Sequence, residues 1–232
     1  MRFGVGNVGR GLAAAALLTG VATGCGEAGR GTEASPGKAT AETAEAAETA
    51  GVAARGGSIG ADGSACELPV TFDIAESWTA EAVDAAVQKS DTGDELTDEL
   101  ADELADALLR QGPVTMACEV DAKPAGNIGF LRVWTGEPGD ADARAVLEQF
   151  VAAESGASGA EYRSFGAGGL HGAEVEYVTT SEVLEETKKE RALAVTTTDG
   201  PVVLHLGGMD TEEHEEMLPA FELAKSTLKA TA

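Results

Sequence analysis

The sequence has few basic residues. Its 232 residues include 16 Lys and Arg against 40 Asp and Glu, which gives a formal net charge of -24. Recognition of phosphate needs clustered Lys and Arg, and a surface this acidic repels nucleic acid. We therefore expect no nucleic-acid partner. Hydrophobic residues, at 43%, are still numerous enough for a folded core.

Cysteine and histidine are also scarce, with three of each. No two cysteines have the Cys-x-x-Cys spacing of zinc sites, and His171, His205 and His214 are scattered. The sequence has neither a Gly-x-Ser-x-Gly elbow nor a His-Glu-x-x-His motif, because Glu216 stands after His214-Glu215 and no histidine closes the pattern. We expect no metal site, no cofactor and no recognisable catalytic residues.

The first 24 residues have the pattern of a secretory signal peptide. Arg2 and Arg10 are the only charges before Glu27, and an uncharged, mostly apolar run occupies 11–23. A positive start followed by an apolar segment is typical of export signals. The run is shorter than the roughly 20 apolar residues that span a bilayer. A buried core helix is the alternative, but the charge-free and Gly-rich flanks favour export.

Small residues lead directly into a cysteine in Val21-Ala22-Thr23-Gly24-Cys25. This segment resembles the lipobox of bacterial lipoproteins, in which the cysteine receives a diacylglycerol and becomes the new N-terminus. The usual pattern has Leu three residues before the cysteine, where this sequence has Ala22. The resemblance implies lipidation of Cys25 and a membrane as partner, with ordinary cleavage as the alternative.

The other two cysteines are Cys66 and Cys118. If Cys25 carries lipid, they remain as an even pair in an oxidising compartment, where disulfides form. A bridge between them would close a loop of about 53 residues and stabilise the domain by roughly 4 kcal/mol. The alternative is a free, buried Cys118 with an unrelated Cys66.

Composition divides the rest of the chain into two parts. Residues 25–65, which begin at the expected lipidated cysteine, are rich in Ala, Gly, Glu and Thr and lack aromatic residues. Such a segment buries too little apolar surface to offset the entropy of ordering, so we expect a disordered tether. Nine of the ten aromatic residues lie in 66–232. This range has the length of one domain.

Periodicity predicts alternating strands and amphipathic helices in 66–232. Period-two alternation is typical of half-buried strands, and spacings of three and four are typical of helices. The order favours an α+β fold in which a mainly antiparallel sheet is packed between helices. Strands are expected at 68–74, 114–120, 127–134, 162–165, 173–180, 191–198 and 201–206. Helices are expected at 80–89, 94–110 and 142–153, and a last one begins at Pro219.

Some landmarks of this region resemble a known family. Ser77-Trp78 follows the leading strand, hairpin strands come next, and Leu218 to Ala224 form a closing Leu-Pro-x-Phe-x-x-Ala segment. These features are similar to small actinobacterial secreted lipoproteins with a PsbP-like fold, of the LpqN type. The resemblance implies an antiparallel sheet between helical layers. It implies function by binding and transfers no functional residue to this chain.

Three conspicuous segments have ordinary explanations. The acidic run at 91–106 is consistent with Ca²⁺ or Mg²⁺ ligands, but a regular helix cannot wrap its carboxylates around one ion, so we interpret it as a solvated face. The acidic cluster at 210–216 suits the positive end of a helix dipole. The Gly-rich segment 166–172 does not match a phosphate loop, and we expect a hairpin turn with His171 exposed.

These observations favour a lipid-anchored protein on the outer face of the cytoplasmic membrane. Its domain would be a non-enzymatic module that binds an envelope protein or a small ligand. One alternative is a secreted hydrolase or accessory enzyme whose site uses scattered Asp, Glu and His. Another is a passive surface protein without a specific ligand. A polar cleft would favour the enzyme, and an exposed apolar patch would favour a protein partner.

Overall fold

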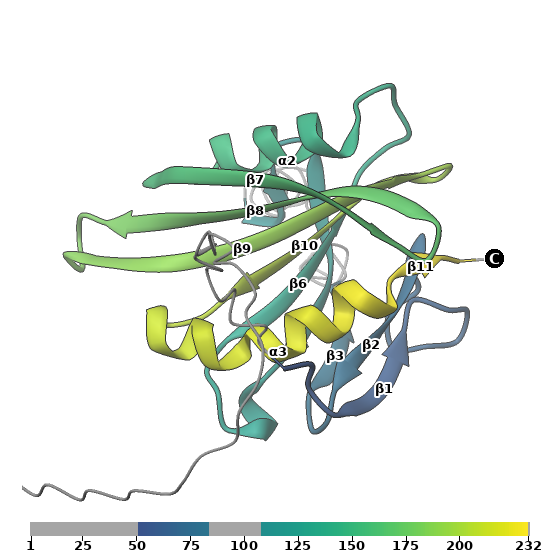
Figure 1. The fold of residues 1–232 in the computed structure, drawn as a ribbon, viewed down its shortest axis with the longest axis horizontal. Coiled ribbons are helices and arrows are strands. Elements are labelled where there is room, and N and C mark those ends of the chain that lie inside the picture. The colour runs from purple at the N-terminus through teal and green to yellow at the C-terminus, as the bar shows by residue number, and fades with distance from the viewer. Residues whose placement is uncertain (1–50, 84–107, 232) are drawn as a thin grey trace, which may run out of the picture. The chain divides into compact units, whose positions relative to one another are not determined.

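The computed structural model describes residues 51–83 and 108–231 (Figure 1). The described chain forms two antiparallel sheets and two α-helices. The smaller sheet has the order β1-β2-β11, formed by β1 (Arg55–Ile59), β2 (Val70–Ala75) and β11 (Lys229–Ala230). The larger sheet has the order β3-β5-β6-β10-β9-β8-β7, and β4 also pairs with β5. Its strands are β3 (Thr79–Ala82), β4 (Arg110–Gln111), β5 (Val114–Asp121), β6 (Phe130–Thr135), β7 (Ala157–Ala167), β8 (Leu170–Ser181), β9 (Glu186–Thr197) and β10 (Gly200–Gly207).

The two helices, α2 (Ala143–Ala152) and α3 (Thr211–Thr227), lie on opposite faces of the larger sheet (Figure 1). Alternate side chains of β9 contribute to the hydrophobic cores on the two faces of the larger sheet. Ala192 and Ala194 belong to the core beneath α2, while Leu193 and Val195 belong to the core beneath α3. Successive side chains of a strand point to opposite faces, so both faces of β9 are buried. The expected α+β architecture, with an antiparallel sheet between helices, is confirmed.

Both helices begin at an aspartate cap. The carboxylate of Asp142 accepts a hydrogen bond from Ala145 N at 2.8 Å, and Asp210 accepts one from Glu213 N at 2.9 Å. Such caps satisfy backbone donors that the first helical turn leaves unpaired. The helix predicted at 142–153 is therefore confirmed almost to the residue.

The predicted start of the last helix was wrong. We expected it at Pro219, whereas α3 begins at Thr211 and holds Pro219 in its interior. The Asp210 cap sets the start, and the helix tolerates the one hydrogen bond that an interior proline removes. Met217, Phe221 and Ala224 of α3 are buried, and so is Leu228 directly after it.

Ordered structure also begins earlier than the composition suggested. The expected tether ran to residue 65, but β1 (Arg55–Ile59) pairs with β2 inside that range. Gly56 makes this pairing possible, since a Cβ there would lie 2.5 Å from the carbonyl oxygen of Ala75. Glycine lowered the apparent order of the segment, yet here it allows close backbone approach. Ile59 anchors the strand in the core, where it is buried.

The region after β2 differs from expectation as well. The predicted helix at 80–89 is wrong at its start, because β3 (Thr79–Ala82) pairs with β5 instead. Residues 84–107 lie outside the described part of the chain, and with them most of the predicted 94–110 helix and the 91–106 acidic run. Leu108 and Leu109 are helical, and Arg110 already belongs to β4.

A disulfide joins Cys66 to Cys118, as predicted, with 6.0 Å between their Cα atoms. Cys66 precedes β2, and Cys118 lies in β5. Both residues are buried in the core under α3. The alternative of a free Cys118 is thus wrong, and the bond links the segment between β1 and β2 to the larger sheet.

Candidate functional site

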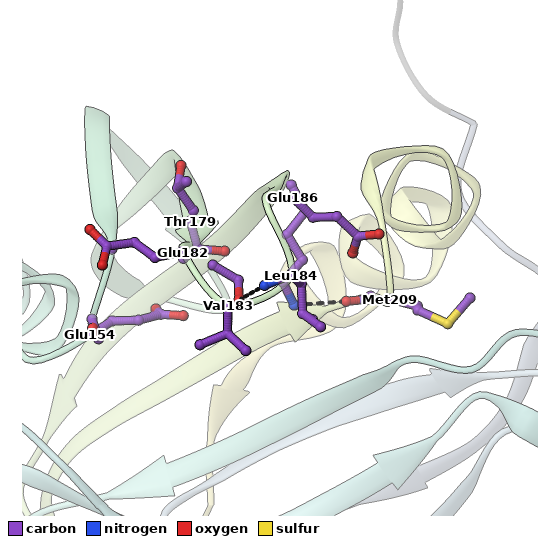
Figure 2. A pocket seen from close by; sticks show the side chains of 13 residues that line it. Glu154, Thr179, Glu182, Val183, Leu184, Glu186 and Met209 are labelled. Carbon is purple, nitrogen blue, oxygen red and sulfur yellow. Dashed lines mark hydrogen bonds between the residues drawn. The ribbon is translucent and has the colours of Figure 1, made fainter.

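A cavity of about 700 Å³ opens beside the hairpin between β8 and β9 (Figure 2). In Figure 2, Glu154 and Met209 mark opposite ends of the cavity, with Val183 and Leu184 between them. The lining comes from the segment after α2, the end of β8, the hairpin turn, the start of β9 and the segment before α3. It consists of Glu154, Ser155, Gly156, Thr179, Thr180, Ser181, Glu182, Val183, Leu184, Glu186, Lys188, Gly208 and Met209.

One side of the cavity is apolar. Val183 is 92% exposed and Leu184 is 67% exposed at the hairpin turn, while Met209 is 58% exposed. The turn is held by the hydroxyl of Ser181, which accepts a hydrogen bond from Leu184 N at 3.2 Å. Three large apolar side chains at the cavity mouth are thus open to solvent.

The polar part of the lining is negative. Glu154, Glu182 and Glu186 face one lysine, Lys188, which leaves a formal charge of -2. The ammonium of Lys188 is already engaged, since it lies 2.8 Å from Glu190 Oε1 and donates to the carbonyl of Gly208 at 2.8 Å. The positive charge of Lys188 is thus paired with Glu190, and the negative cavity lining favours a cationic group over an anionic one.

Behind the lining lies a buried polar cluster of Tyr177, Glu190 and His205, which are 1%, 1% and 6% exposed. The hydroxyl of Tyr177 donates to Glu154 Oε2 at 2.5 Å and lies 3.1 Å from His205 Nε2. Since the tyrosine proton is used by Glu154, a hydrogen bond between Tyr177 and His205 is donated by the imidazole. The same Nε2 lies 3.2 Å from Glu190 Oε2.

Strand register brings these side chains together. Tyr177 of β8 is the direct partner of Glu190 in β9, and His205 of β10 is opposite Ala192, two residues further along β9. All three point to the face that α2 covers. The ring of Phe150 on α2 packs edge-on against His205, with 5.6 Å between centroids. Three cavity residues, Glu154, Thr179 and Lys188, contact cluster members directly.

Burial and hydrogen bonding act in opposite directions on the acid of this cluster. Burial tends to raise the pKa of Glu190, but the neighbouring His205 and Lys188 outweigh it and hold the pKa below the usual value. Burial, together with the charge of Glu154, raises the pKa of the Tyr177 phenol. Glu190 is therefore ionised and Tyr177 is protonated at neutral pH.

A second polar cluster lies on the opposite face of the sheet, beneath α3. Arg191 and Lys225 form ion pairs there with the buried Glu174, at 3.7 Å and 3.2 Å. Glu222 of α3 joins the same network through both bases. Each charge has an opposite partner, so this cluster fixes α3 to the sheet.

The residues singled out from the sequence have scattered positions. His171 is exposed in β8 next to the turn at 168–169, which confirms the hairpin interpretation of 166–172. His214 is buried in α3. In the acidic segment 210–216, Asp210 caps α3, and Glu213 accepts a hydrogen bond from Met209 N at 2.6 Å. Trp134 and Trp78 are both buried in the core. Cys25 lies outside the described residues.

Glu154, Tyr177 and Glu190 were not predicted from the sequence as site residues. A signal for them was present, because β8 and β9 carry polar residues at positions whose neighbours on the same face are apolar. On this face, β8 carries the apolar Ala173 and Val175, followed by Tyr177 and Thr179. Strand β9 carries Lys188 and Glu190, followed by the apolar Ala192 and Ala194. Recognising the cluster required the register between the strands.

No helix among the described residues is long and apolar enough to cross a membrane. Comparison with curated proteins and with solved structures gave no significant match. A family model described as an uncharacterised lipoprotein matches residues 36–228, which is most of the chain. Membership in a lipoprotein family indicates attachment to the membrane through lipid and a place in the cell envelope. The chain therefore belongs to this family of uncharacterised lipoproteins.

Proposed function

We propose that this protein is a lipoprotein held by a lipid on Cys25 at the outer face of the cytoplasmic membrane. Two observations support the anchor: the match to a lipoprotein family and the sequence Val21-Ala22-Thr23-Gly24-Cys25. Residues 1–24 would be removed as the signal peptide. An anchor of two acyl chains holds stably, whereas one chain binds only marginally.

We also propose that the folded domain binds a ligand in the cavity between the β8–β9 hairpin and Met209, without catalysing a reaction. The observation that carries this proposal is the pairing of an apolar rim with a negative wall. Val183, Leu184 and Met209 offer apolar contact, and Glu154, Glu182 and Glu186 offer carboxylates. The ligand class that fits has an apolar chain or ring that bears a cationic group.

Changing Cys25 to Ala tests the anchor. We expect the Cys25→Ala protein to leave the membrane fraction and appear in the medium, since nothing else proposed holds it. The control is Ala22→Leu, which restores the usual residue of the lipobox and should keep the protein on the membrane. Membrane retention of Cys25→Ala at the level of the unchanged protein would refute the anchor.

Two probes of opposite charge test the cavity. Decyltrimethylammonium and decanoate carry the same apolar chain, so their difference isolates the head group. We expect the cation to shift the methyl NMR signals of Val183 and Leu184 at lower concentration than the anion. Glu182→Gln with Glu186→Gln should remove this preference, whereas Glu161→Gln on β7 should not. Equal binding of the two probes, or no binding, would contradict the proposed ligand class.

One observation favours the alternative of a secreted hydrolase, namely that Glu190 and His205 lie directly behind the cavity. The contacts of His205 argue for binding instead. Its Nε2 contacts Tyr177 and Glu190, and a phenol with a raised pKa is a poor nucleophile. Hydrolysis of chromogenic ester or glycoside substrates by the pure protein, abolished by His205→Gln, would support the enzyme.

The kinship with PsbP-like actinobacterial lipoproteins also remains a proposal. The antiparallel sheet between α2 and α3 and the buried Trp78 support it. An experimental structure superposed on a PsbP-like domain tests it. A different strand order in the large sheet would exclude the kinship.

A further inference from the structure

We propose that Glu154, Glu190 and His205 form a zinc site at the inner wall of the cavity. These side chains come from three parts of the fold: the segment after α2, strand β9 and strand β10. One ligand atom from each lies within 4.8 Å of the other two. Imidazole and carboxylate groups are both zinc ligands, and zinc sites with three protein ligands keep a fourth position open.

Two of the ligand atoms already have the right separation. His205 Nε2 and Glu190 Oε2 lie 3.2 Å apart. A tetrahedral Zn²⁺ ion with bonds of 2.0–2.1 Å places its ligands about 3.3 Å from one another. The third ligand, Glu154, is the most exposed of the three and lines the cavity, and its ligand oxygen already lies within 4.8 Å of the other two ligand atoms.

The two oxygens of Glu190 have different surroundings. Oε1 is held by the ammonium of Lys188 at 2.8 Å and lies 3.5 Å from the hydroxyl of Thr179. Oε2 is buried and accepts no hydrogen bond within the described part of the chain. A buried carboxylate oxygen without a donor is costly, and a bound cation would remove that cost. Oε1 is thus held in place by its partners, and Oε2 remains available to bind the ion.

Tyr177 fits the role of an orienting residue. Its hydroxyl donates to Glu154 Oε2 and accepts from His205 Nε2. When zinc binds, Nε2 presents its lone pair to the ion and gives up its hydrogen bond to the tyrosine oxygen. The bond from Tyr177 to Glu154 remains and orients that carboxylate. The open fourth position faces the cavity, where water or a ligand donor completes the site.

Zinc is the best match because the set mixes imidazole with carboxylates. Mg²⁺ and Ca²⁺ prefer oxygen ligands alone, and soft ions prefer sulfur. A zinc site here differs from the expectation of no metal site, which rested on the spacing of cysteines and histidines along the sequence. It stands independently of the organic ligand proposed above, since the cluster is complete without one.

The first test is a zinc titration of the purified full chain in detergent, with excess Mg²⁺ present. The chain carries a formal charge of -24, and Mg²⁺ occupies acidic surface groups without competing for the imidazole. We expect one zinc ion per chain, measured by equilibrium dialysis and elemental analysis. No bound zinc under these conditions overturns the proposal.

Zinc affinities of variants in the cluster test where the ion binds. Glu190→Gln and His205→Gln keep the shape of the side chains while removing a charge or the imidazole ligand, and each should weaken zinc binding at least tenfold. The matched control is His171→Gln, which removes an exposed histidine outside the cluster and should leave affinity unchanged. Unchanged affinity in His205→Gln overturns the site, and so does a loss in His171→Gln.

A measurement on the unchanged protein covers the case in which a variant fails to fold. Nitrogen-detected NMR of the three histidines during a zinc titration reports which ring binds. We expect the Nε2 signal of His205 to shift, with His171 and His214 unaffected. A shift confined to either of the other histidines refutes the assignment.

Discussion

The hydroxyl of Tyr177 donates a 2.5 Å hydrogen bond to Glu154, which joins the middle of β8 to the segment that follows α2. Tyr177 is only 1% exposed, whereas Glu154 reaches the cavity. One buried bond therefore connects the position of α2 to the shape of the cavity wall.

Tyr177→Phe should destabilise the domain by about 1.5–3 kcal/mol, because it removes a hydrogen bond to a charged acceptor in a buried setting. Urea denaturation measures the change. Tyr162→Phe is the matched control, since its ring packs under the guanidinium of Arg144 and the substitution preserves that contact. A Tyr177→Phe domain as stable as the control would show that the bond contributes nothing.

His214 should make stability depend on pH between 6.5 and 4. Burial, reinforced by the charges of Arg191 and His205 and opposed by those of Glu190 and Glu176, lowers the pKa of His214 to about 4. As pH falls below 6.5, the unfolded chain binds a proton here and the folded chain does not. Stability falls over this window, by about 3 kcal/mol in total.

The variant His214→Leu isolates this contribution, because leucine fills the site without titrating. We expect the difference in unfolding free energy between variant and unchanged protein to shift in favour of the variant as pH is lowered from 6.5 to 4. Parallel pH profiles would mean that His214 titrates alike in the folded and unfolded chain.

Removing the Cys66–Cys118 disulfide should cost about 4 kcal/mol, because the bond closes a sequence separation of 52 residues in the unfolded chain. Cys66→Ala with Cys118→Ala, compared by urea denaturation, measures the loss. Reductant should destabilise the unchanged protein by a similar amount and leave the double variant unaffected. Two free thiols at these positions in the denatured, unreduced chain would contradict the bond.

Gly156 should tolerate alanine worse than Gly159 does. Both have positive φ, at 78° and 64°, which costs an L-residue about 1–2 kcal/mol. Only at Gly156 would the added Cβ also collide with the carbonyl oxygen of Thr180, at 2.3 Å, while at Gly159 the nearest atom is 3.9 Å away. Thermal unfolding of the two variants compares them. Equal losses would mean that backbone strain alone matters.

Features with a local cause were predictable from the sequence. The hairpin between β9 and β10 follows from alternation and from Gly200, which has a φ of 120°. The start of α2 follows from the Asp142 cap. The strand β1 was missed because glycine lowers the apparent order of a segment, whereas Gly56 is required there by the closeness of β2.

The site was less predictable, because it depends on register. Tyr177, Glu190 and His205 belong to three strands, and a slip of one residue in any of them would send its side chain to the other face. No spacing along the chain brings His205 to Glu190. The cavity also depends on the length of the β8–β9 hairpin, which places Val183 and Leu184 opposite Met209.

The position of the disulfide bears on how the domain carries mechanical load. If the chain is held at Cys25, a pull on the domain enters through β1, where Ala53 N bonds to Pro219 O and Glu76 N bonds to Ala54 O. These hydrogen bonds and those between β1 and β2 break first. Unravelling then stops at Cys66, because its covalent bond to Cys118 passes the force directly into β5. The load thus enters the larger sheet at β5, which β6 and β10 separate from the cavity strands β9 and β8.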